Sequence, residues 1–278
     1  MLTLYHAPGS ASSQKVRLVL AEKACAWHPH TVDLFAGDQH RPAFRALNPR
    51  GEVPVVVHRG RVLTEAGLIA VYLDDAFPEP GLTPSAAGDR DRMRRWLAAV
   101  DDGLHRACGV LSYALAGRMM LATRTPGEIG AVIDRMPDAE ARAVRRRVIE
   151  QGMNAPDVVP ALARHVALLD DLEQALTDGP WLAGDRLSLA DLVAVVYVWR
   201  LDHLGLDGLW RGGLRPNVAA WAHRLRARPS YHAAVGAYLP GPLLQAMRAK
   251  GAVASLLLPH VDSRRGDGRQ GAGRRQSA

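Results

Sequence analysis

The order of strand-like and helix-like segments in the first eighty residues determines the fold class that this sequence predicts. Strand-like segments, with apolar alternation or β-branched runs, lie at residues 2–5, 28–33, 53–58 and 61–63. Helical spacing of apolar residues predicts helices at residues 12–23, 41–46 and 66–74. The order βαβ followed by ββα packs as a mixed sheet between helices, so we expect an α/β domain over residues 1–80.

A helical region is predicted to follow this unit. A Pro- and Gly-rich linker is expected at residues 76–86, before an all-helical domain over residues 87–250. Helices are predicted at residues 92–115, 160–176, 189–204 and 218–227. The third of these is nearly all apolar, which is typical of a helix buried on every side. Residues 121–158 are charged and weakly periodic, and they are predicted either as short helices or as an insertion.

The net charge of +7 raises the question of a nucleic-acid partner, but much of the charge lies in one short segment. Residues 259–278 hold five of the 35 basic and two of the 28 acidic residues, and the remainder carries a net charge of +4. We expect this Arg- and Gly-rich tail to be disordered. The rest of the chain lacks a basic patch interleaved with aromatic residues, so nucleic-acid binding is not expected.

The cysteines and the N-terminus favour a cytoplasmic location. Cys25 and Cys108 are too few for a disulfide framework, which suits a reducing compartment. No apolar stretch reaches the length of about 18 residues that a membrane span needs. Met1 is followed directly by strand-like sequence and not by a basic signal region. We therefore expect a cytoplasmic protein without membrane contact.

Two groups of residues resemble the glutathione transferase superfamily. Asn48-Pro49-Arg50-Gly51-Glu52-Val53-Pro54, followed by Thr64-Glu65, is similar to its glutathione-binding half, and Trp181-Leu182-Ala183-Gly184-Asp185 with Ser188-Leu189-Ala190-Asp191 is similar to the capping motif of its buried C-terminal helix. The resemblance implies a thioredoxin-like N-terminal domain, an all-helical C-terminal domain, glutathione as co-substrate and a homodimer. Residues 5–17, Gln39-His40 and residues 101–118 are most similar to bacterial proteins related to β-etherases, which cleave aryl ethers with glutathione.

The resemblance assigns the glutathione contacts residue by residue. It implies a cis bond before Pro54, with the main chain of Val53 exchanging hydrogen bonds with the cysteinyl part of glutathione as an added strand does. Glu65 and Ala66 begin a helix whose N-terminus attracts the γ-glutamyl carboxylate. The family usually has Ser where this chain has Ala66, so we expect weaker glutathione binding. Gln39 and His40 are expected at the glycyl end, with a solvated loop as the alternative.

The reactive centre is expected at the start of the first helix, because glutathione attacks as the thiolate and a hydroxyl or a helix N-terminus can stabilise that anion. Ser10, Ser12 and Ser13 all stand there. Relatives place Cys or Ser at the position that aligns with Ser12, serine-type relatives favour Ser10, and a shift of one residue would select Ser13. We favour Ser12. The alternative is that these serines only cap the helix.

The second substrate is expected to meet the long helix of the C-terminal domain. His105, Tyr113 and Arg118 are predicted on its cleft face, where Tyr113 and Arg118 could contact an aromatic or anionic electrophile; packing and surface roles are the alternatives. The eleven His show no HExxH spacing and no CxxC pair occurs, so no metal site is predicted. The resemblance thus implies a glutathione transferase, and the closer resemblance suggests ether cleavage as its reaction. The alternative is a non-catalytic binding or regulatory module of the same fold.

Overall fold

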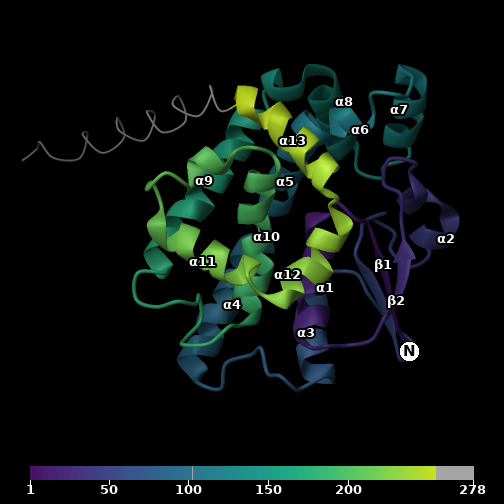
Figure 1. Ribbon diagram of the computed structural model, residues 1–278. Helices are drawn as coiled ribbons and strands as arrows, with labels where there is room; N and C mark the ends of the chain where they lie inside the picture. The colour runs from purple at the N-terminus through teal and green to yellow at the C-terminus, as the bar shows by residue number, and fades with distance from the viewer. Residues whose placement is uncertain (102, 255–278) are drawn as a thin grey trace, which may run out of the picture.

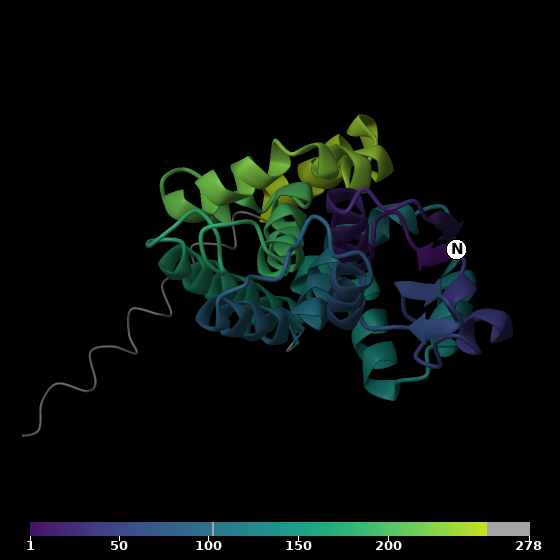
Figure 2. The ribbon, with the colours of Figure 1, turned by 90° about the horizontal axis from the view of Figure 1, so that it is seen from below.

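The computed structural model describes residues 1–101 and 103–254, so the Arg- and Gly-rich tail predicted from residue 259 lies outside the described residues. The chain forms a thioredoxin-like N-terminal domain followed by an all-helical domain (Figure 1). Figure 2 places the strands at one end of the molecule and most helices at the other. In the described part of the chain, no helix combines the length and the apolar character that a membrane crossing requires.

The N-terminal sheet has four strands in the order β2-β1-β3-β4. The strands are β1 Leu2–His6, β2 His28–Thr31, β3 Val55–His58 and β4 Arg61–Leu63. β1 pairs with β2 in parallel and with β3 in antiparallel orientation, and β3 and β4 form the predicted hairpin. Helices α1 (Ala11–Glu22) and α3 (Ala66–Ala76) pack together, and a short α2 (Pro42–Arg45) follows β2. The predicted mixed sheet is confirmed.

The all-helical domain surrounds one buried helix. Its helices are α4 Ala87–Asp101, α5 Leu104–Ser112, α6 Arg118–Met120, α7 Pro126–Asp134, α8 Ala139–Gln151, α9 Val158–Ala175, α10 Leu189–His203, α11 Pro216–Arg226, α12 Pro229–Ala234 and α13 Gly241–Ala254. Every residue of α10 is buried, and α10 contacts α1 and α4 as well as α11 and α13. The prediction that this segment is buried on all sides is confirmed.

The sequence was wrong about one long helix over residues 92–115. The helical path is interrupted between α4 and α5, where Gly103 has a φ of 72°. Glycine adopts this left-handed conformation without the steric cost that a side chain would add. Beyond α5, a π-helical turn at Tyr113–Gly117 leads into α6. Residues 121–158 include α7 and α8, which agrees with the first of the two predicted alternatives.

Two buried histidines give a testable pH dependence of stability. His165 and His203 are fully buried, and burial lowers the pKa of His165 to about 4 and that of His203 to about 3. The unfolded chain binds these protons from about pH 6.5, so stability that is present above pH 6.5 is lost as the pH falls. We expect each histidine to cost about 1–2 kcal/mol between pH 7 and pH 5, measured by urea unfolding at both pH values.

A matched variant separates this effect from general acid sensitivity. His165→Leu removes one of these two buried histidines, at the cost of the hydrogen bond between its Nδ1 and the Ala161 carbonyl. The variant is expected to lose less stability than the wild type over the same pH range. Equal stability of the wild type at pH 7 and pH 5 would contradict the assignment.

Candidate functional site

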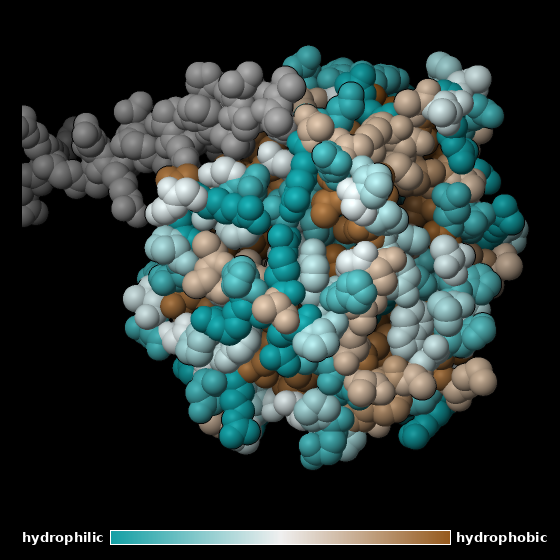
Figure 3. All heavy atoms as spheres, viewed as in Figure 1, coloured by the Kyte–Doolittle hydropathy of each residue, from teal (hydrophilic) through white to brown (hydrophobic). Residues whose placement is uncertain are grey.

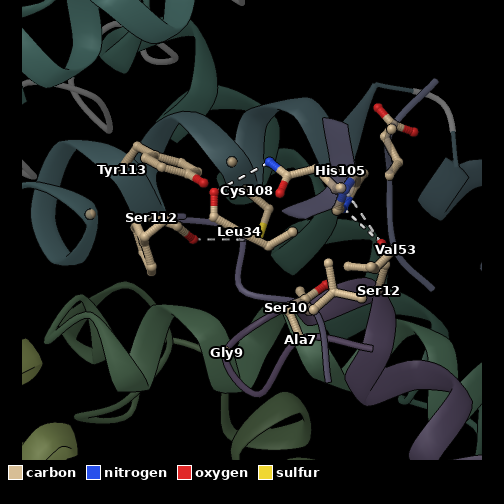
Figure 4. Close-up of a pocket in the computed structure, with 18 of the residues that line it drawn as sticks. Ala7, Gly9, Ser10, Ser12, Leu34, Val53, His105, Cys108, Ser112 and Tyr113 are labelled. Carbon is tan, nitrogen blue, oxygen red and sulfur yellow. Dashed lines mark hydrogen bonds between the residues drawn. The ribbon is translucent and has the colours of Figure 1, made fainter. Parts of the chain in front are cut away.

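A cavity of about 1060 Å³ lies between the two domains. The sheet domain contributes the loop after β1, the first turn of α1, the loop after β2, the turn before Val53 and the start of α3. The helical domain contributes α5, the π-helical turn, parts of α7 and α8, and Leu239, Leu243 and Met247 near the C-terminal end. Figure 4 shows part of this lining, with His105, Cys108, Ser112 and Tyr113 from the helical domain. On the outer face, hydrophobic residues are visible among hydrophilic side chains next to α13 (Figure 3).

The three candidate serines have different environments. Ser10 is the N-cap of α1, and its hydroxyl accepts the N–H of Ser13 at 3.2 Å. Ser13 is fully buried, its Oγ accepts the N–H of Ala7 at 3.3 Å, and it does not line the cavity. Ser10 and Ser12 do line it. The position of Ser13 therefore suits a structural role. Ser12 and Ser10 remain the candidates for stabilising the thiolate, because both line the cavity.

Ser12 is joined to the helical domain by a hydrogen bond with His105. Its Oγ lies 3.1 Å from Nδ1 and 3.4 Å from Nε2 of His105 (Figure 4). Sequence reasoning placed His105 on the cleft face as a substrate contact but did not connect it to Ser12. A neutral imidazole has one N–H donor and one acceptor nitrogen. If the N–H points to Ser12, the hydroxyl of Ser12 keeps its own proton free for another acceptor.

The electrostatic environment keeps His105 neutral. The His105 side chain is exposed to the cavity, but the protein around the cavity displaces part of the water that would solvate a charged ring. Desolvation by the surrounding protein, and after it the positive charges of Lys15, Arg200 and Arg145, lower the pKa of His105 below its ordinary value. Neutral His105 adds no charge of its own to a cavity wall that Arg200 and Arg145 also line. An anion formed beside Ser12 would meet a favourable potential.

The helix N-terminus at Ser12 adds further donors. The first N–H groups of an α-helix have no intrahelical acceptor. The Ser10 side chain takes the N–H of Ser13, which leaves the N–H groups of Ala11 and Ser12 without an acceptor inside the helix. Both residues line the cavity. This end of α1 is therefore chemically suited to hold a thiolate.

The cis bond predicted between Val53 and Pro54 is present. Val53 lines the cavity and lies two residues before β3, outside the pairing of β3 with β1. The preceding turn is held by Asn48, a buried residue whose Nδ2 donates to the Glu52 carbonyl at 2.8 Å and whose Oδ1 accepts the N–H of Arg50 at 3.2 Å. The role of Asn48 was not predicted, although Asn before such a turn is a common turn residue.

The first turn of α3 also opens into the cavity. Glu65 occupies the N-cap position but makes no capping hydrogen bond with its side chain, which forms an ion pair with Arg50. Ala66 is buried at the first helical position, and both residues line the cavity. The N-terminus of this eleven-residue helix is thus available to a carboxylate.

Gln39 and His40 lie in the cavity wall and not in a solvated loop. The Gln39 amide donates to the Leu34 carbonyl at 3.2 Å. Within the described residues, Gln39 Oε1 and His40 Nδ1 are buried without a hydrogen-bond partner. Buried polar atoms normally have partners. Because both atoms are enclosed, with His40 Nδ1 against Gly51, a ligand could reach them only if the side chains rotated.

The structure separates the two remaining predicted contacts. Tyr113 lines the cavity, where its ring lies 5.9 Å from that of Phe35 and 3.3 Å from the guanidinium carbon of Arg145. Arg118 does not line the cavity, so its predicted place on the cleft face is corrected. Its exposed side chain lies against Gly152, where an added Cβ would collide with it. Because Gly152 has no side chain, Arg118 can pack against its backbone.

Sequence reasoning missed two cations that line the cavity, Arg200 and Arg145. Arg200 is a charged residue in the otherwise nearly apolar segment of α10, and that contrast was a usable signal. Arg145 lies on α8, within the charged segment of residues 121–158 that the sequence predicted either as short helices or as an insertion. Among residues 1–101 and 103–254, no group of three or more His, Cys, Asp or Glu side chains is arranged to hold a metal ion.

Comparisons with known proteins agree with this geometry. Residues 4–81 match the family model "Glutathione S-transferase, N-terminal domain", and residues 137–224 match "Glutathione S-transferase, C-terminal domain". The chain is 31% identical to Glutathione S-transferase 3 of Zea mays over 252 residues, covering 87% of this chain and 96% of that protein. It is 27% identical to Protein LigF of Sphingobium sp. strain SYK-6 over 233 residues, covering 82% and 91%. The crystal structure of β-etherase LigF superimposes with a TM-score of 0.76 at 28% identity, covering 85% of this chain and 99% of that one.

Proposed function

Because the chain belongs to the glutathione S-transferase superfamily, we propose that it is an enzyme that activates the thiol of glutathione for attack on an electrophilic aromatic small molecule. The observation that carries this proposal is the Ser12 hydroxyl, which faces the cavity at the N-terminus of α1 and is hydrogen-bonded to His105. A thiol has to lose its proton before it becomes a strong nucleophile, and these groups favour the anion.

In the proposed mechanism, the Ser12 O–H donates to the sulfur of glutathione, and the N–H groups at the start of α1 add their positive field. His105 acts as a positioning residue, because its ring N–H donates to Ser12 Oγ and turns the serine proton toward the sulfur. The thiol proton leaves to water in the cavity. The pair of electrons on sulfur then forms the new C–S bond, and the leaving group departs with the electrons of the broken bond.

Glutathione is proposed to lie along the sheet-domain side of the cavity. Its γ-glutamyl carboxylate would bind at the N-terminus of α3, and its cysteinyl main chain would pair with Val53. Gln39 and His40, which line the cavity, would lie near the glycyl end. This placement brings the sulfur to Ser12 and leaves the helical side of the cavity to the second substrate.

The narrower proposal is that the second substrate is an aryl ether. It is supported by the similarity to β-etherase LigF and by the aromatic wall formed by Tyr113 and Phe35. Attack on the ether carbon would form the C–S bond, break the C–O bond and release an aryloxide that takes a proton from water. The alternative is a non-catalytic binding or regulatory module, which would hold glutathione without consuming it.

Turnover measurements separate these possibilities. The purified protein is incubated with glutathione and either an activated aryl halide or a β-aryl ether, and thioether and phenol are quantified by chromatography. We expect glutathione-dependent thioether in at least one reaction, with equimolar phenol if the ether is cleaved. Binding of glutathione without consumption of either electrophile would favour the non-catalytic module.

Ala66→Ser should strengthen glutathione binding, because the superfamily usually has serine there. A hydroxyl at the first position of α3 adds one hydrogen bond to the γ-glutamyl carboxylate, which predicts a Kd about fivefold lower by calorimetry. Ala76→Ser at the other end of the same helix is the matched control and should leave the Kd unchanged. An unaltered Kd for Ala66→Ser would contradict the proposed position of that carboxylate.

A further inference from the structure

Arg200 is an unusual feature of the cavity, because its charge is buried without a counter-charge. The residue is 4% exposed on the buried helix α10. Its Nη1 donates to Ser112 Oγ at 3.3 Å and its Nη2 donates to the Gly9 carbonyl. Its Nε is buried without a partner, and no carboxylate in the described part of the chain pairs with it. An unpaired buried charge is costly, so a purely structural arginine would normally be better satisfied.

Arg17 shows what a satisfied buried arginine looks like in this protein. Its guanidinium donates to the carbonyls of Ala234, Ala7 and Pro8 at 2.7, 3.2 and 2.9 Å and lies 3.0 Å from His6 Nδ1. Burial lowers its pKa to about 10, and it does not line the cavity. Arg200 has two neutral partners and does line the cavity. The difference points to a ligand that supplies the counter-charge that Arg200 lacks.

The helical side of the cavity, with Ser112 and Tyr113, lies opposite the proposed position of the glutathione cysteinyl group. In Figure 4, Ser112 and Tyr113 lie across the cavity from Val53 and Ser12. Arg200 donates to Ser112 on this side and to the Gly9 carbonyl in the loop before α1, so its guanidinium lies between the two. The aromatic ring of Tyr113, with the guanidinium of Arg145 over it, forms the adjoining wall. A flat molecule against this wall would be able to direct an anionic group toward Arg200.

The acidic residues that line the cavity do not neutralise Arg200. Glu65 pairs with Arg50, Asp33 accepts the N–H groups of Phe35 and Ala36 in its own loop, and Asp138 caps α8. Glu52 lies 3.8 Å from Arg50 and is exposed. Each carboxylate is thus engaged with groups other than Arg200.

We propose that the cavity binds, beside Arg200, an anionic oxygen of the second substrate, carried by an aromatic ring as a carboxylate or phenolate, with Arg200 as the cation that holds it. This inference rests on the proposed function, because it defines the acceptor class of the same cavity. Arginine and a hydroxyl together suit such an oxygen, since hydrogen bonds to charged groups are about twice as strong as neutral ones.

The test compares matched probes by calorimetry on the full chain. 2-Naphthoate is compared with 2-naphthamide, and 2,4-dinitrophenolate with 1,3-dinitrobenzene, so that the carboxylate and phenolate sources are distinguished. We expect the anion of at least one pair to bind about tenfold to a hundredfold more tightly than its neutral partner. Arg200→Met should remove that preference, while Arg200→Lys keeps the charge and should retain part of it.

Arg106→Met is the control for a general positive field. Arg106 lines the rim of the cavity, is exposed, and has only contacts of 3.9 and 4.0 Å with Asp138 and Glu140. Its loss should change the anion affinity less than threefold, as expected for a solvent-screened charge. Equal binding of anion and neutral probe by the wild type would overturn the proposal without any variant. A loss in Arg106→Met as large as in Arg200→Met would overturn it as well.

Glutathione binding is titrated separately on the same samples. Absence of a heat of glutathione binding would count against the proposed function. Absence of the preference for the anionic probe would count only against the role of Arg200, so the two failures are distinguishable. Adding glutathione before the probe gives one further readout. The anion preference should persist with glutathione bound, and competitive displacement of the anion by glutathione would place the anion in the glutathione site and overturn the proposal.

Discussion

Ser12→Ala is expected to lower kcat for glutathione-dependent turnover about a hundredfold at pH 7, with the KM for glutathione changed less than threefold. Removing one preorganised donor to a catalytic anion costs about 10²–10³ in rate. The main-chain contacts proposed at Val53 and the N-terminus of α3 do not involve the serine, so binding should survive. Steady-state kinetics with varied glutathione separates the two parameters.

The neighbouring serines provide matched controls. Ser13→Ala removes the acceptor of the Ala7 N–H, and Ser10→Ala removes the N-cap of α1. Each is expected to lower stability by about 1 kcal/mol and to retain most of the activity. If Ser10→Ala abolished turnover while Ser12→Ala remained active, the thiolate donor would be Ser10 and the proposed role of the His105 pair would be lost.

Asp191→Ala is expected to destabilise the protein by about 3–5 kcal/mol, because its fully buried carboxylate accepts four hydrogen bonds. The donors are the N–H groups of Leu182 and Ser188, the Ser188 hydroxyl and Trp221 Nε1, at 2.9 to 3.0 Å. They join the start of α10 to the preceding loop and to α11. Burial raises the pKa of Asp191, and these hydrogen bonds oppose that shift.

Urea unfolding of two further variants identifies the cause. Asp191→Asn keeps the shape but replaces one acceptor oxygen by a donor, so it should lose about half as much stability as Asp191→Ala. Asp171→Ala, at an exposed position on α9, should remain within about 0.5 kcal/mol of the wild type. A loss below about 1 kcal/mol for Asp191→Ala would mean that the buried network does not stabilise the start of α10.

Local patterns predicted most of the fold because they are set by near neighbours. The hairpin and the capping box of Ser188 with Asp191 depend on residues a few positions apart, whereas the cis bond at Pro54 was implied by the family resemblance. The break at Gly103 was missed because apolar residues continue in helical spacing on both sides of it. One glycine within such a pattern does not reveal whether the chain turns left-handed there.

The site was less predictable than the fold, because its parts come from different domains. Ser12 and His105 are 93 positions apart, and their hydrogen bond depends on how α5 packs against α1. Sequence spacing gives no information on that packing. Arg118 shows the opposite error, since a side chain chosen for its chemistry turned toward the space beside Gly152.

The thiolate of bound glutathione tests the central claim most directly. Glutathione is titrated into the wild type and into Ser12→Ala by calorimetry, and the ultraviolet absorbance of the thiolate is followed against pH. We predict binding at millimolar glutathione or below, with the wild-type thiolate forming at least one pH unit below the value of about 8.5 typical of a free thiol and the variant returning toward that value. No binding at millimolar glutathione, or a thiolate that titrates as it does in free solution, would contradict the account.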